Sequence, residues 1–186
     1  MKYDPQRHHR RSIRLPDYDY SQPGAYFITL VTQGRERLFG EIHDSEIHLN
    51  EAGQIVWEIW NSLPVRYPQV SAGTAIVMPD HFHGIVIINE SSVPVGAVHE
   101  LPRRGITDQI ERRRMTLPLV VGYLKMNTAK RINLRHGMEG VPVWQRNYYE
   151  RVIRDDEEHR RIHSYIQSNV ENWSRDKGNP VAGTSR

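Results

Sequence analysis

The chain of 186 residues contains no cysteine, which excludes disulfide bonds and thiolate metal ligands. It also lacks any apolar run near the roughly 20 residues that a membrane-spanning helix requires. Its N-terminal segment is polar and basic, without the apolar stretch typical of a signal peptide. From these absences we expect a cytoplasmic protein with no membrane segment.

Charge is present in both signs but is unevenly distributed. The chain has 25 lysines and arginines against 22 aspartates and glutamates, for a formal net charge of +3. Residues 1–20 are rich in basic residues, residues 89–116 carry five arginines, and residues 117–134 contain no acidic residue. Such segments favour an anionic partner such as nucleic acid, although solvated surface loops have the same composition.

The length suits one domain with extensions. We expect a basic arm over residues 1–20 and a folded domain over residues 21–173. A flexible basic insertion at residues 89–116 is expected to interrupt that domain, and residues 174–186 are expected to form a disordered tail.

Hydrophobic periodicity predicts an α+β domain. The helix boundaries are marked by Asn50 as an N-cap, by Pro64 as an end, and by Asp155 with Glu158 as a capping box. In chain order we expect a strand at 25–32, an edge hairpin at 41–49, a helix at 50–63, strands at 75–78 and 81–88, a helix at 117–134, a short strand within 141–149 and a helix at 156–173. This order favours an antiparallel sheet with helices packed on it, in a split βαβ (ferredoxin-like) arrangement.

Two histidines stand at the start of the most apolar strand. Pro79 and Asp80 form a turn between two β-branched runs, and His81 and His83 follow at the strand period of two. Their side chains therefore leave the same face, where two imidazoles can bind one divalent cation. The alternative is that both are simply polar residues at the mouth of a strand.

Four stretches of the chain carry a family resemblance. They are SQPGAYFIT at residues 21–29, VMPDHFHG at 77–84, VWQRNYY at 143–149 and RIHSYIQSN at 161–169. In this order the set resembles the REP-associated tyrosine transposases, within the single-tyrosine HUH endonuclease superfamily. That resemblance covers most of residues 11–173 and agrees with the α+β architecture.

The resemblance implies a set of site residues. His81 and His83 match the paired metal ligands of the family, and Asn169 occupies the place of a third ligand, where related enzymes often have glutamine. The implied cofactor is Mg²⁺ or Mn²⁺. Tyr165 matches the nucleophile, which in this family forms a 5′-phosphotyrosine link on single-stranded or hairpin DNA. Val170 stands where proline is common.

The chemistry is also plausible from the residues themselves. A phenol is a poor nucleophile at neutral pH, and a metal near the scissile phosphate would stabilise the charge of the transition state. Tyr165 and Asn169 are four residues apart, so one continuous helix would place both on one face. Without the family, Tyr165 reads as a half-buried core tyrosine, and Tyr148 and Tyr149 are rival nucleophiles.

Basic, amide and aromatic residues complete the expected DNA contacts: Arg10, Arg11, Arg14, Lys125, Lys130, Arg131, Gln145, Arg146, Tyr148 and Tyr149. Two other functions remain open. One is a nucleic-acid-binding module that has lost catalysis, and the other is a hydrolase that uses a histidine-bound metal and water. Monomer and homodimer are both compatible with the sequence.

Overall fold

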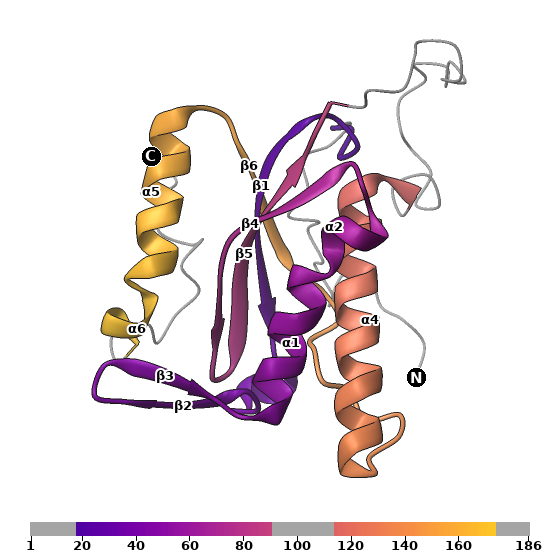
Figure 1. The fold of residues 1–186 in the computed structure, drawn as a ribbon, viewed down its shortest axis with the longest axis vertical. Helices are drawn as coiled ribbons and strands as arrows, with labels where there is room; N and C mark the ends of the chain where they lie inside the picture. The colour runs from indigo at the N-terminus through magenta and orange to yellow at the C-terminus, as the bar shows by residue number, and fades with distance from the viewer. Residues whose placement is uncertain (1–17, 91–113, 174–186) are drawn as a thin grey trace, which may run out of the picture.

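The computed structural model describes residues 18–90 and 114–173 (Figure 1). Its elements follow the expected alternation of strands and helices. They are β1 (Gly24–Val31), the short 3₁₀ helix η1 (Gln33–Arg35), β2 (Gly40–His43), β3 (Glu46–Leu49), α1 (Glu51–Asn61), α2 (Leu63–Arg66), β4 (Val70–Met78), β5 (His81–Ile88), α4 (Thr116–His136), β6 (Tyr149–Ile153), α5 (Asp156–Gln167) and α6 (Asn169–Asn172).

The central sheet has the strand order β4-β5-β1-β6, and every neighbouring pair in it is antiparallel. It follows that β1 and β4 run in the same direction with β5 between them, and that β5 and β6 do so with β1 between them. Each of these parallel pairs is joined through a helix. The expected α+β class and split βαβ arrangement are therefore confirmed.

Helices cover both faces of this sheet. Figure 1 shows α1 and α4 on one side and α5 on the other. The α1/α4 side holds the larger core, to which the strands contribute alternate residues such as Tyr26, Ile28 and Phe82. The α5 side holds a small core of Phe27, Ile85, Ile162 and Ile166. The apolar stripes expected on α1 and α4 are buried in the larger core.

The segment from residue 39 to residue 66 differs from the sequence expectation in two places. The hairpin of β2 and β3 forms its own two-stranded sheet and is not an edge of the central one. Asn50 does cap α1, its side chain accepting a hydrogen bond from the Gly53 amide. Pro64, however, does not end the helical region. It lies in the first turn of α2, where the missing N–H of proline costs no hydrogen bond.

The C-terminal region differs as well. The last strand is β6 at Tyr149–Ile153, later than expected, while Trp144 makes only an isolated bridge with Thr32. The predicted helix at 156–173 is two helices, because α5 ends at Gln167 and α6 begins at Asn169. Ser168 separates them and has a ψ of 4°, away from helical geometry.

The expected basic arm, the insertion and the tail lie mainly outside the described residues, which omit 1–17, 91–113 and 174–186. At the start of the described part, Tyr20 is already buried in the larger core. Within residues 18–90 and 114–173, no helix has the length and apolar character needed to cross a membrane.

Candidate active site

The two histidines lie on the sheet face that α5 covers. His83 pairs with Thr29 on β1, and Thr29 pairs in turn with Tyr149 on β6. Directly paired residues of antiparallel strands share a face, so these three side chains leave the sheet on one side. His81 shares that face because it is two residues from His83 on β5. This placement confirms that the two side chains share a face.

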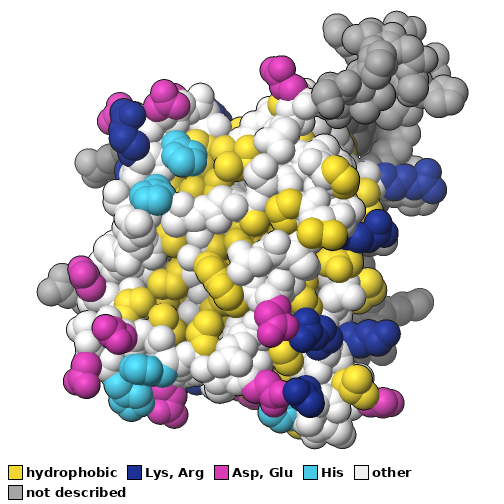
Figure 2. Space-filling view, in the orientation of Figure 1, with side chains coloured by type: hydrophobic (Ala, Val, Ile, Leu, Met, Phe, Trp, Pro, Cys, Tyr) yellow, Lys and Arg dark blue, Asp and Glu magenta, His cyan; other side chains and the backbone are white. Residues whose placement is uncertain are grey.

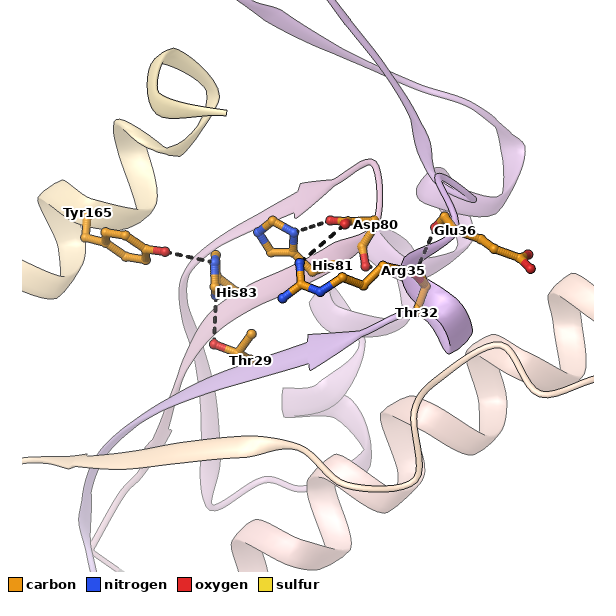
Figure 3. Close-up of polar contacts among 8 residues, drawn as sticks. All are labelled: Thr29, Thr32, Arg35, Glu36, Asp80, His81, His83 and Tyr165. Carbon is orange, nitrogen blue, oxygen red and sulfur yellow. Dashed lines mark hydrogen bonds and ion pairs between the residues drawn. The ribbon is translucent and has the colours of Figure 1, made fainter. Parts of the chain in front are cut away.

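His83 is fully buried between a strand and a helix. Its Nδ1 lies 2.9 Å from the Thr29 hydroxyl, and its Nε2 lies 3.4 Å from the Tyr165 hydroxyl (Figure 3). Burial, followed by the nearby His81, lowers the pKa of His83 well below its usual value, so the ring is neutral at pH 7. If Nδ1 donates to Thr29, the Nε2 lone pair faces Tyr165.

His81 is held by a carboxylate. Its Nδ1 lies 2.5 Å from Asp80 Oδ1. An ionised carboxylate can only accept, so Nδ1–H is the donor and Nε2 carries the free lone pair. Nε2 of His81 is buried and has no hydrogen-bond partner among the described residues. A histidine fixed by a carboxylate with its other nitrogen open is the usual arrangement of a metal-ligating imidazole.

Asn169 has a further buried atom with a free lone pair, its side-chain oxygen. Its side-chain oxygen also has no hydrogen-bond partner among the described residues, and the residue is only 2% exposed. Asn169 begins α6, so it is not on the helix of Tyr165 as expected. Trp173, at the end of α6, stacks on the His81 ring with centroids 5.9 Å apart. This contact places Trp173 against the His81 ring.

These donors suit a divalent cation. No group of three histidine, aspartate or glutamate side chains in residues 18–90 and 114–173 is arranged to hold a metal. A metal centre here therefore needs the amide oxygen of Asn169, or water, beside the two imidazoles. Oxygen and imidazole donors in this combination match Mg²⁺ or Mn²⁺ less closely than an all-oxygen site would, and Mn²⁺ accepts the mixture more readily.

The structure separates the three tyrosines that the sequence offered as nucleophiles. The Tyr165 hydroxyl contacts His83 directly. Tyr149 shares the face but lies two strands away, about 10 Å at the usual strand spacing. Tyr148 packs against the larger core. Of the three, Tyr165 is therefore the one beside the histidine pair.

The expected DNA-contacting residues are spread over the molecule. Figure 2 shows lysine and arginine side chains gathered on the side where α4 lies, with acidic neighbours. Lys130 and Arg146 are exposed, whereas Arg131 is paired with Glu58 at 2.7 Å. Arg10, Arg11 and Arg14 lie outside the described residues.

Lys125 and Gln145 belong to one contact between α4 and the loop before β6. The Lys125 ammonium donates to the backbone oxygens of Gln145 and Arg146, at 2.6 and 2.9 Å. Burial lowers the pKa of Lys125 to about 8. The backbone N–H of Gln145 donates to the backbone oxygen of Val31. Lys125 therefore holds the loop in place through two hydrogen bonds of its ammonium group.

Sequence reasoning missed four residues of the site: Thr29, Arg35, Asp80 and Trp173. Asp80 was assigned only a turn, although its position directly before His81 is a signal that could have been used. The contacts of Thr29 and Arg35 depend on strand register and loop docking, which no local pattern reveals.

The fold and the site define an α+β protein with a buried histidine pair under a tyrosine-bearing helix. No family model matches the chain. It is 36% identical over 182 residues to an uncharacterized protein of Haemophilus influenzae, and the match covers 95% of this chain and 96% of that protein. The chain belongs to the same family as that protein.

Two solved structures are similar at 16% identity. One is a REP-associated tyrosine transposase bound to a REP hairpin, with a TM-score of 0.48 over 91% of this chain and 74% of that one. The other is a candidate transposase from Deinococcus radiodurans, with a TM-score of 0.45 over 79% of this chain and 91% of that one. At these scores neither likeness indicates what this chain does.

Proposed function

We propose that this protein is a metal-dependent enzyme that nicks and joins single-stranded or hairpin DNA through a covalent bond to Tyr165, as a transposase does. The observation that carries the proposal is the position of the Tyr165 hydroxyl, 3.4 Å from Nε2 of the buried His83. A tyrosine packed there only for stability would not need the buried Nε2 of His81, whose ring contacts that of His83, to be left without a hydrogen-bond partner among the described residues.

The reaction uses Tyr165 as the nucleophile. Its oxygen attacks the scissile phosphorus, an O–P bond forms to the 5′ side, and the bond to the 3′ oxygen breaks. The phenolic proton leaves Tyr165 and the departing 3′ oxygen gains one, so a free 3′-hydroxyl results. The phosphodiester count is unchanged, so a second 3′-hydroxyl can reverse the step and join the strands.

His81, His83 and Asn169 are the residues that would hold a divalent cation. Such an ion would supply positive charge for the negative charge that develops on the phosphate. Asp80 and Thr29 fix the two rings so that each Nε2 presents a lone pair. The Nε2 of His83 cannot bind a cation and accept from Tyr165 at once. With a cation on His83, the Tyr165 hydroxyl would lose its resting contact with that ring.

The experiment is covalent capture of DNA. A labelled single-stranded hairpin oligonucleotide is incubated with the full chain and Mn²⁺, and adducts are separated on a denaturing gel. We expect an adduct with the unaltered protein and none with Tyr165→Phe, which keeps the ring that contacts Phe27 and His83. Tyr149→Phe is the matched control, because it removes a hydroxyl from the same face.

Two outcomes would replace the proposal. Repeated cleavage without any adduct would favour the hydrolase that activates water. Binding of the oligonucleotide without cleavage or adduct, with each metal tried, would favour the nucleic-acid-binding module.

A further inference from the structure

The segment after β1 is fastened to the turn that precedes His81. The backbone amide and the hydroxyl of Thr32 both donate to the backbone oxygen of Asp80, each at 2.9 Å. The hydroxyl also lies 2.8 Å from the backbone oxygen of Glu36. The Phe39 amide donates to the Pro79 oxygen at 3.1 Å. The loop of residues 32–39 therefore has a fixed position relative to the histidine pair.

Within that loop, Arg35 has an unusual backbone. Its φ is +56°, next to Gly34 at +65°. Glycine adopts this region without cost, but arginine does so with strain, and strain of this kind is found most often at functional positions. The left-handed conformation directs the arginine side chain back over Asp80. Figure 3 shows it extending from η1 toward His81.

The guanidinium of Arg35 is held close to the site but loosely. Its nearest nitrogen lies 3.6 Å from Asp80 Oδ2, too far for a hydrogen bond, and 46% of the side chain is exposed. Asp80 already accepts from His81 through its other oxygen. Arg35 has five N–H donors in a planar fork that matches phosphate oxygens. Charge attraction thus keeps the fork beside the site while its donors stay available.

A second arginine of the same loop faces the same site. Arg37 lies over the Trp173 ring, with 5.8 Å from its guanidinium carbon to the ring centroid, and Trp173 stacks on His81. One loop therefore supplies Arg35 beside Asp80 and Arg37 beside the Trp173 ring that stacks on His81. This clustering is what an anionic strand entering the site would require.

We propose that Arg35 is a phosphate-binding residue that grips one backbone phosphate of the DNA strand next to the scissile bond, with Asp80 attracting its guanidinium and orienting the His81 ring. This inference rests on the proposed function, since it takes the ligand to be DNA. The competing explanation is that Arg35 only neutralises Asp80 and so acts on His81 alone.

The test is a phosphate scan by binding, in the Tyr165→Phe background so that no cleavage intervenes. Hairpin oligonucleotides carry a neutral methylphosphonate at one position at a time. We expect Arg35→Gln to weaken binding about tenfold and to reduce the salt dependence by about one phosphate contact. One methylphosphonate should weaken binding of the arginine form and leave Arg35→Gln unaffected. Glutamine at position 35 must adopt the same left-handed backbone as arginine, so the two forms carry similar backbone strain.

Arg66→Gln is the control variant. Arg66 is exposed and precedes β4, at the end of that strand opposite to Asp80. It should shift binding equally for all oligonucleotides or not at all. If Arg35→Gln does not fold by circular dichroism, Arg35→Lys replaces it, and we expect the coupling to the one phosphate to weaken because the fork is lost.

The inference is overturned if Arg35→Gln, or the lysine variant, weakens binding at every methylphosphonate position by the same factor. The inference is also overturned if Arg35→Gln lowers Mn²⁺ affinity but leaves metal-free DNA binding unchanged, which is the result for neutralisation of Asp80. Failure of the proposed function gives a different pattern, in which the phosphate coupling persists but no Tyr165 adduct forms in the unaltered protein.

Discussion

Two groups of buried polar side chains, one on each face of the central sheet, differ in whether their atoms are hydrogen-bonded. On the α1/α4 face, Trp144 donates to the Thr128 hydroxyl at 2.7 Å, and that hydroxyl donates to the Leu124 oxygen at 2.7 Å. On the α5 face, His81 and Asn169 each leave a buried atom without a partner among the described residues. The Trp144–Thr128 pair thus satisfies its polar atoms with hydrogen bonds, while the His81 and Asn169 atoms stay open at a cost in stability.

The open atoms of His81 and Asn169 lie on the side of the smaller core. Among the residues that the structure describes, Phe27, Ile85, Ile162 and Ile166 form the buried apolar centre under α5. The helix is fastened at its start, where Glu158 contacts Arg151 and the Arg154 amide, and at His163, which lies 2.6 Å from the Thr74 hydroxyl. Polar contacts thus fix the helix that carries Tyr165, where a larger apolar core would leave no room for a site.

The sharpest test of the contrast uses two neighbours on β5 that face opposite ways. Phe82 is fully buried in the larger core, so Phe82→Ala should lower the free energy of unfolding by about 4 kcal/mol. His83→Ala should cost less, about 1 kcal/mol for the lost hydrogen bond to Thr29, but should abolish DNA cleavage. Urea unfolding and the cleavage assay measure the two effects. Equal losses of stability would show that both faces serve the same purpose.

Asn169→Ala should behave in the opposite way from an ordinary core substitution. The change removes an acceptor that is buried without a partner, so in metal-free buffer the protein should be stabilised by up to about 1 kcal/mol. Cleavage should fall but persist, because His81 and His83 still bind a cation. Thermal unfolding with and without Mn²⁺ provides the measurement. Destabilisation in metal-free buffer would mean that the amide is satisfied.

The smallest expected effect concerns the charge buried on the other face. Because the pKa of Lys125 is lowered to about 8 in the folded protein, the unfolded chain binds more protons between pH 8 and about 10.4. Stability should therefore rise with pH across this window, and the contribution is lost as pH falls toward 8. Lys125 is partly exposed, so the gain should be under about 1 kcal/mol. Urea unfolding at pH 7.5 and 9.5 measures this rise in stability, and Lys125→Met should not show it.

Much of the architecture could be predicted from periodicity. The shared face of His81 and His83 follows from a strand period of two, and the caps at Asn50 and Asp155 follow from local chemistry. The predictions that were wrong, such as the single helix at 156–173, concern features that depend on the rest of the fold. The break at Ser168 has no strong sequence signal, because neither glycine nor proline marks it.

The candidate site could be predicted from the sequence only in part, because its contacts join residues that are far apart in the chain. The sequence placed Tyr165 by resemblance, but its contact with His83 joins residues 82 positions apart. Thr29 reaches His83 through strand register, and Arg35 reaches Asp80 through a docked loop. Such contacts are products of the folded chain, and only the structure could reveal them.

The most direct test of the account is the identity of the residue that becomes linked to DNA. Protein trapped with a hairpin oligonucleotide and Mn²⁺ is digested, and the nucleotide-bearing peptide is sequenced by mass spectrometry. We predict a phosphotyrosine bond at Tyr165 that forms only when both His81 and His83 are present. A nucleotide on Tyr148 or Tyr149, or an adduct that survives in Tyr165→Phe, would contradict it.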